Sequence, residues 1–166
     1  MALRNIVKVG DDTLRKTSKP VTDFDGRLNN LLDDMWETMR EQRGLGLAAP
    51  QVGILRRAVV IEVPDPKSAD AGDDEDAMEL ISYELVNPVI LESSGEAFEY
   101  EGCLSVPGKT GKVRRPARVK IQAQDRKGRY FILDGEGLLA KAVFHELDHL
   151  DGVLFIDIAE EIEEVE

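Results

Sequence analysis

The sequence has few of the residues on which several common classes of protein depend. Cys103 is its single cysteine, so no disulfide can form within the chain. Lys and Arg number 21 against 33 Asp and Glu, a formal net charge of −12, whereas binding to nucleic-acid phosphates requires a basic face. No apolar run approaches the roughly 20 residues of a membrane span, and the N-terminus lacks a signal-peptide core. We therefore expect a cytoplasmic protein that recognises neither membrane nor nucleic acid directly.

The remaining composition fits one folded domain covering residues 1–166. Hydrophobic residues make up 42% of the chain and charged residues 33%, which is typical of a globular protein with a substantial core. An apolar stripe at helical spacing predicts a helix after residue 23. Apolar or alternating runs predict strands at 57–63, 85–91, 118–124, 130–133 and, at the end, 154–156.

Two further patterns refine this fold. Asn87-Pro88 lies inside one predicted strand and indicates an edge strand or a bulge. Residues 64 to about 78 are polar and acidic, which favours a mobile surface insertion. The strands follow one another without a regular strand–helix alternation. We therefore expect an α+β fold with antiparallel β-sheets packed around a central helix, described next.

The motif His145-Glu146-Leu147-Asp148-His149 is expected on that helix. Residues four apart lie on one face of a helix, so both imidazoles can reach one metal ion. Glu146 lies about 100° round the helix from His145, where it can act on a metal-bound water as a general base. These are the only two histidines in the chain, which argues against a chance pairing.

A catalytic metal site usually has three protein ligands, so a third is needed. The thiolate of Cys103 is one candidate, and Glu160 or Glu161 is the other. The glutamates would fit a zinc endopeptidase with Cys103 as a structural residue. A closed, purely structural site would need a fourth ligand, and the chain has no second cysteine or third histidine to provide it.

Three segments together resemble the peptide deformylases. They are Gly44-Leu45-Gly46-Leu47-Ala48-Ala49-Pro50-Gln51, Glu101-Gly102-Cys103-Leu104-Ser105, and the motif extended to His149-Leu150-Asp151-Gly152. Their order and spacing match across residues 44–152. The resemblance implies a metallohydrolase that removes the N-formyl group from the first methionine of newly made bacterial proteins and releases formate, a co-translational step of protein biosynthesis.

The resemblance also implies roles for individual residues. Cys103, His145 and His149 would bind the metal, with a water in the fourth position. Glu146 would be the general base and then the acid. Gln51 and the backbone N–H of Leu104 would hold the oxyanion.

Substrate contacts follow from the same resemblance. Leu45, Gly46 and Glu101 would lie at the substrate, with Gly46 pairing its backbone with the peptide. Glu101 would pair with an arginine, by spacing Arg115. Lys141 stands near the methionine pocket, where many members have an apolar residue, and its stem could line the pocket while the ammonium reaches water.

The implied cofactor is one divalent metal ion, Fe²⁺ by family preference, with Zn²⁺, Ni²⁺ or Co²⁺ as substitutes. The implied partner is the nascent formyl-Met polypeptide. The ribosome is an open second partner, because the short acidic C-terminus replaces the longer helical tail with which some members contact it. Segment 64–84 is longer and more acidic than is usual in the family.

Overall fold

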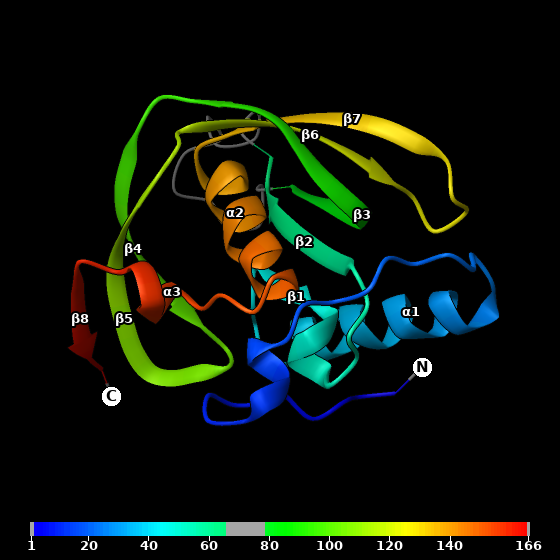
Figure 1. The fold of residues 1–166 in the computed structure, drawn as a ribbon, viewed down its shortest axis with the longest axis horizontal. Helices are drawn as coiled ribbons and strands as arrows, with labels where there is room; N and C mark the ends of the chain where they lie inside the picture. The colour runs from blue at the N-terminus through cyan, green and yellow to red at the C-terminus, as the bar shows by residue number, and fades with distance from the viewer. Residues whose placement is uncertain (1, 66–78, 166) are drawn as a thin grey trace.

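The computed structural model describes residues 2–65 and 79–165. These residues form two antiparallel β-sheets, two long helices and several short helical turns, arranged as in Figure 1. In order, the elements are the 3₁₀ turn η1 (Asp12–Arg15), α1 (Gly26–Glu41), β1 (Gly46–Ala48), the 3₁₀ turn η2 (Ala49–Val52), β2 (Ala58–Pro64), β3 (Leu80–Ser94), β4 (Ala97–Cys103), β5 (Val106–Arg115), β6 (Arg118–Gln124), β7 (Tyr130–Glu136), α2 (Leu138–Leu150), α3 (Phe155–Ile158) and β8 (Glu161–Glu164). Among the described residues, no helix is long and apolar enough to cross a membrane.

The two sheets lie on different sides of α2 (Figure 1). One has five strands in the order β1-β2-β3-β6-β7, and the other has three in the order β4-β5-β8. All strand pairs are antiparallel. The predicted α+β fold with antiparallel sheets is therefore confirmed. Strands β1 and β4 each stand at the edge of a sheet, which matters for the site below.

The core around the five-stranded sheet has two layers, one on each face of β2. Val59 and Ile61 point to the layer under α2, whereas Ala58 and Val60 point to the layer under α1. This alternation is the two-residue period of a strand, and it explains why the run is apolar at nearly every position. The α2 layer fixes the helix that bears both histidines onto the five-stranded sheet.

The bulge expected at Asn87-Pro88 is present. The register of β3 against β6 shifts between Val86 and Val89, and Asn87 has a φ of +50°. Its side-chain amide donates to the backbone oxygen of Val21 and to Gln124 Oε1 at 2.9 Å each. The alternative of an edge strand is wrong, since β3 is the central strand of the sheet.

The prediction of a final strand at 154–156 is wrong. Phe155–Ile158 forms one helical turn, in which the Asp157 carboxylate accepts from the backbone N–H of Leu154 at 2.9 Å. A short apolar run does not distinguish a strand from a helical turn, and this local cap decides it. The last strand is instead β8, whose acidic residues pair with β5.

The predicted acidic insertion falls mainly on residues 66–78, which lie outside the described residues. Residues 80–84, at its far end, belong to β3 and pair with β2. The segment available to an insertion is therefore shorter than 64–84.

Candidate metal centre and active site

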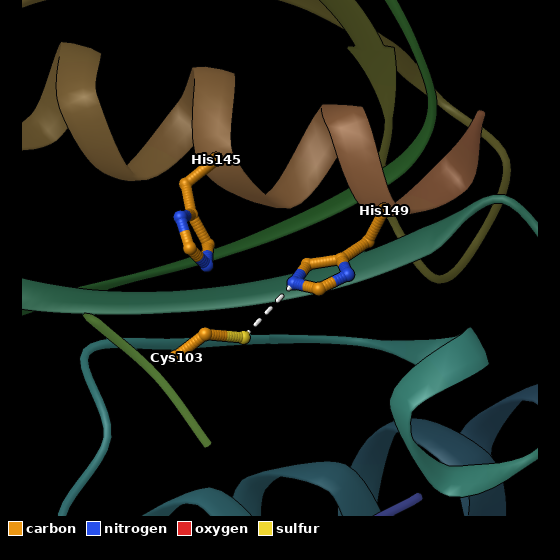
Figure 2. A group of neighbouring side chains, drawn as sticks. All are labelled: Cys103, His145 and His149. Atoms are coloured by element: carbon orange, nitrogen blue, oxygen red, sulfur yellow. Dashed lines mark hydrogen bonds between the residues drawn. The ribbon is translucent and has the colours of Figure 1, made fainter. Parts of the chain in front are cut away.

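Helix α2 and the end of β4 bring three metal-ligating side chains together. His145 and His149 point from one face of α2 towards Cys103, as Figure 2 shows. One potential ligand atom from each residue lies within 4.8 Å of the other two. Cys103 Sγ is 3.3 Å from His149 Nε2, and the His149 side chain is almost completely buried.

The surroundings of the two imidazoles suit a metal ion. His145 Nδ1 lies 2.9 Å from Glu101 Oε1, an arrangement that leaves Nε2 for a ligand. Burial lowers the pKa of His145, but hydrogen bonds to Cys103 and Glu101 and the charge of Glu146 outweigh it and raise the pKa to about 10. A metal ion at Nε2 would take the place of the second ring proton. Burial and the charges of His145 and Arg115 lower the pKa of His149 to about 3, which leaves a neutral imidazole. One thiolate and two imidazoles form a donor set that fits a divalent transition metal.

A buried ionic cluster supports this centre from behind. Arg115 on β5 donates to both oxygens of Glu101, at 2.6 and 2.8 Å, so the pair expected from spacing is confirmed. Burial raises the pKa of Glu101, but the hydrogen bonds from Arg115 and His145 outweigh this effect and lower the pKa to about 2. Arg115 also donates to Asp148 at 2.8 Å. Sequence reasoning missed Asp148, although its position three residues after His145 on a helix places the two on neighbouring faces.

Glu146 is buried beside this centre and lines the adjoining pocket. Among the described residues, its Oε1 has no hydrogen-bond partner. Burial raises its pKa to about 7. Its other oxygen is close to Gly46, where an added Cβ would lie 2.7 Å from Oε2. Position 46 therefore requires glycine if Glu146 is to keep this place.

Gln51 reaches the centre from η2. Its Oε1 accepts from the backbone N–H of Ala48 at 3.0 Å, which turns Nε2 towards Cys103 Sγ at 3.5 Å and Ser105 Oγ at 3.1 Å. Ser105 is completely buried and was missed by sequence reasoning, which treated it only as part of a motif. Leu104 lies in the turn between β4 and β5, and like Gln51 it lines the pocket.

A pocket of about 350 Å³ opens from this centre. It brings together all the predicted site residues except His149. The lining residues are Gly44, Leu45, Gly46, Gln51, Tyr100, Glu101, Gly102, Cys103, Leu104, Leu138, Lys141, Ala142, His145 and Glu146.

Strand β1 offers this pocket a free edge. The backbone N–H of Glu62 donates to the oxygen of Leu45, so residues 45 and 62 form a hydrogen-bonded antiparallel pair. Gly46 stands opposite Ile61, one position on. Because hydrogen-bonded and non-hydrogen-bonded pairs alternate, the backbone groups of Gly46 face away from β2.

The alternative third ligands lie elsewhere. Glu160 accepts a hydrogen bond from Arg114 Nε at 2.9 Å, on the exposed side of the three-stranded sheet. Glu161 begins β8 opposite Lys112 and is exposed. Neither glutamate belongs to the group formed by Cys103 and the two histidines.

Comparisons with known proteins agree with this geometry. The polypeptide deformylase family model matches residues 3–165. A peptide deformylase of Heliobacterium modesticaldum is 49% identical over 160 residues, covering 96% of each chain. One from Caldicellulosiruptor bescii is 53% identical over 157 residues, covering 95% of this chain and 86% of that protein.

Solved structures give the same result. The peptide deformylase of Thermotoga maritima has a TM-score of 0.83 and 38% identity, covering 96% of this chain and 99% of that chain. A class I type b peptide deformylase from Acinetobacter baumannii, solved with Met-Ala-Ser bound, has a TM-score of 0.83 and 34% identity, covering 94% and 98%. The chain belongs to the peptide deformylase family.

Proposed function

We propose that this protein hydrolyses the N-formyl amide of formylmethionine at the start of newly made polypeptides and releases formate. The observation that carries the proposal is the group of Cys103, His145 and His149 opening into a pocket beside the buried Glu146. Membership of the peptide deformylase family supports the same reaction. The relative with bound Met-Ala-Ser holds a peptide that begins with methionine, as a deformylated product would.

The same three side chains are proposed to hold one divalent ion, Fe²⁺ first, with Zn²⁺, Ni²⁺ or Co²⁺ as substitutes. When bound, such an ion would supply Lewis acidity and lower the pKa of a coordinated water towards about 7. The contribution of Glu101 is to orient His145. Its carboxylate lines the pocket but already bonds Arg115 and His145, so we assign it to ligand positioning and not to direct substrate contact.

Glu146 is the proposed proton carrier. A carboxyl group with a pKa near neutrality can accept a proton from the attacking water and later give it to the leaving amine. Gln51 Nε2 and the N–H of Leu104 would donate hydrogen bonds to the oxygen that becomes anionic. A single donor of this kind is worth roughly 3–4 kcal/mol of transition-state stabilisation.

The edge of β1 that faces the pocket is the proposed binding site for the substrate backbone. Gly46 would exchange backbone hydrogen bonds with the peptide, which adds a strand to the sheet edge. The missing side chain at Gly46 lets that peptide approach Glu146 closely. Because the proposed substrate is a nascent chain, we place the protein in the cytoplasm with the ribosome as a further candidate partner.

The proposal is tested by formate release from formyl-Met-Ala-Ser, using anaerobically purified protein of known metal content. Cys103→Ala should lose most of the metal and the activity, since only the two imidazoles then remain as ligands. Ser105→Ala, which keeps all three ligands, is the control for metal binding. A Cys103→Ala protein that keeps a full equivalent of tightly bound metal would exclude Cys103 as a ligand. If the wild-type protein cut internal amides and left the formyl group in place, the proposed function would be wrong and the protein would be an endopeptidase.

A further inference from the structure

Lys141 occupies an unusual place for a charged residue, between two apolar residues of α2 that line the pocket. It lies on the same face of α2 as His145, one helical turn nearer the N-terminus. Leu138 and Ala142 form the apolar part of this wall, and His145 and Glu146 continue it towards the metal ligands. The Lys141 side chain is only 26% exposed, so its aliphatic stem is part of the pocket surface.

The ammonium group of Lys141 is held by the facing strand. Lys141 Nζ donates to the backbone oxygen of Tyr100 on β4 at 3.0 Å and lies 3.8 Å from the Glu99 carboxylate. Because Glu99 is 61% exposed, that ion pair contributes little. Besides the expected approach to water, the ammonium therefore makes a specific contact with β4, chiefly through the Tyr100 oxygen.

This contact is one of several polar links between α2 and β4, and it is the one farthest from the metal ligands, where Cys103 Sγ meets His149 Nε2 at 3.3 Å. The link nearest to it joins His145 to Glu101 at 2.9 Å. On the helix, residues 141 and 145 are one turn apart, about 6 Å along the axis. On the strand, the Tyr100 carbonyl that Lys141 reaches and the Glu101 carboxylate that His145 reaches belong to adjacent residues, about 3.4 Å apart along the strand. The two links therefore run side by side, the inner one at the metal ligands and the outer one across the pocket.

The outer link joins two elements that belong to different parts of the fold. β4 is an edge strand of the three-stranded sheet, whereas α2 packs on the five-stranded sheet. The Lys141–Tyr100 bond thus helps to set the distance between the pocket wall on α2 and the backbone of β4.

We propose that Lys141 is a specificity-determining residue, which keeps the pocket narrow by tying α2 to the Tyr100 carbonyl. The inference rests on the proposed function, since it takes the pocket to hold the first side chain of the formylated peptide. An unbranched methionine side chain fits a narrow apolar channel, whereas the ring of phenylalanine requires a wider one. Apolar pockets discriminate by size only about 10–200-fold per methylene-sized change, so a partial widening is measurable as relaxed selectivity.

The test compares formyl-Met-Ala-Ser with formyl-Phe-Ala-Ser on metal-loaded protein. Lys141→Met keeps the stem and removes the donor. We expect its ratio of kcat/KM for the two peptides to fall several-fold, up to about tenfold, the effect of one hydrogen bond of ordinary strength. Lys141→Arg keeps a donor and should retain the wild-type ratio. Lys112→Met is the matched control, because Lys112 lies over the rings of Phe98 and Tyr100 and is not among the pocket-lining residues.

A Lys141→Met protein with the wild-type ratio would overturn the inference. An equal loss for both peptides would also overturn it, since this would mark a structural role without an effect on pocket width. If Lys141→Met fails to fold or to bind metal, Lys141→Ala, which removes donor and stem together, gives the same ratio to measure. A wild type that releases no formate from either peptide would instead refute the proposed function.

Discussion

The two sides of α2 are held in different ways. On one side the apolar side chains of Val143, Leu147 and Leu150 pack in the core layer on the five-stranded sheet. On the other side His145 and Asp148 are fixed by a chain of charged hydrogen bonds that runs through Glu101 and Arg115. The same helix thus meets hydrocarbon on one side and buried ions on the other.

The two sides of α2 are therefore expected to contribute differently to stability and to catalysis. Burying an apolar side chain of this size contributes about 1.5–3 kcal/mol and tolerates small changes of shape at moderate cost. Buried ions gain little net stability, but they lose a great deal when one partner is removed. We therefore expect substitutions on the ionic side to impair activity or metal binding, with or without a loss of stability, and substitutions on the apolar side to lower stability alone.

The largest effect should come from Glu146→Gln. This change keeps the size of the side chain and removes the proposed base, so turnover should fall by at least about 10²–10⁴-fold. The loss should appear in kcat more than in KM, because the proton transfer belongs to the transition state. Metal content should stay near that of the wild type, since all three proposed ligands remain. Glu92→Gln, exposed on β3, is the matched control. Near-normal deformylation by the metal-loaded Glu146→Gln protein would exclude this role.

Arg115→Ala should have the next largest effect. It leaves Glu101 buried without its bidentate partner, and breaking such a pair costs roughly 3–5 kcal/mol of unfolding free energy. Because Glu101 orients His145, metal affinity should fall by about 10–100-fold as well. Denaturant unfolding and metal titration measure the two losses separately.

Arg114→Ala provides the comparison for Arg115. Arg114 is the neighbouring residue on β5, but its partners Glu96 and Glu160 are on the surface. Its removal should leave stability and metal affinity near those of the wild type. If the two alanine variants behaved alike, the ionic cluster would not support the metal centre.

The sequence indicated the ionic side better than the apolar side. Histidines four apart with an adjacent glutamate define a site by spacing, and a lone cysteine leaves few choices for a third ligand. The Glu101–Arg115 pair followed from the resemblance and is present. Asp148 and Ser105 were not found, because each is bonded to a residue from a distant segment, and one sequence does not reveal such contacts.

The fold class was predictable, but element ends were not. Alternation and turn residues indicated most of the strands, and their succession without helices indicated antiparallel sheets. The turn at Phe155–Ile158 depends on a cap from Asp157, whereas β8 depends on pairing with β5. The pattern of β8 alone, four exposed residues rich in glutamate, favours solvated surface, so only the tertiary partner makes it a strand.

Ile121→Val tests the apolar side. Ile121 on β6 is completely buried in the layer under α2, and removing one methyl group from such a site costs about 0.5–1.5 kcal/mol. The midpoint of unfolding should fall accordingly, while kcat, KM and metal content stay unchanged. A clear fall in kcat would show that the apolar side also controls the geometry of the site.

The smallest effect is expected from Glu160→Gln, and it discriminates between the two enzyme classes. In the endopeptidase reading Glu160 is a metal ligand, so its replacement should strip the metal. In the structure its carboxylate instead accepts from Arg114 on an exposed surface, away from the three clustered side chains. Losing one charge of such a pair has little effect on stability, since both groups remain hydrated. Metal content and formate release should therefore match those of the wild type, with Glu161→Gln as a parallel variant. Loss of metal from either variant, with Cys103 intact, would show that the third metal ligand is a glutamate of the C-terminal segment. Cys103 would then have a structural role, and the metal centre assigned to the ionic side of α2 would be wrong.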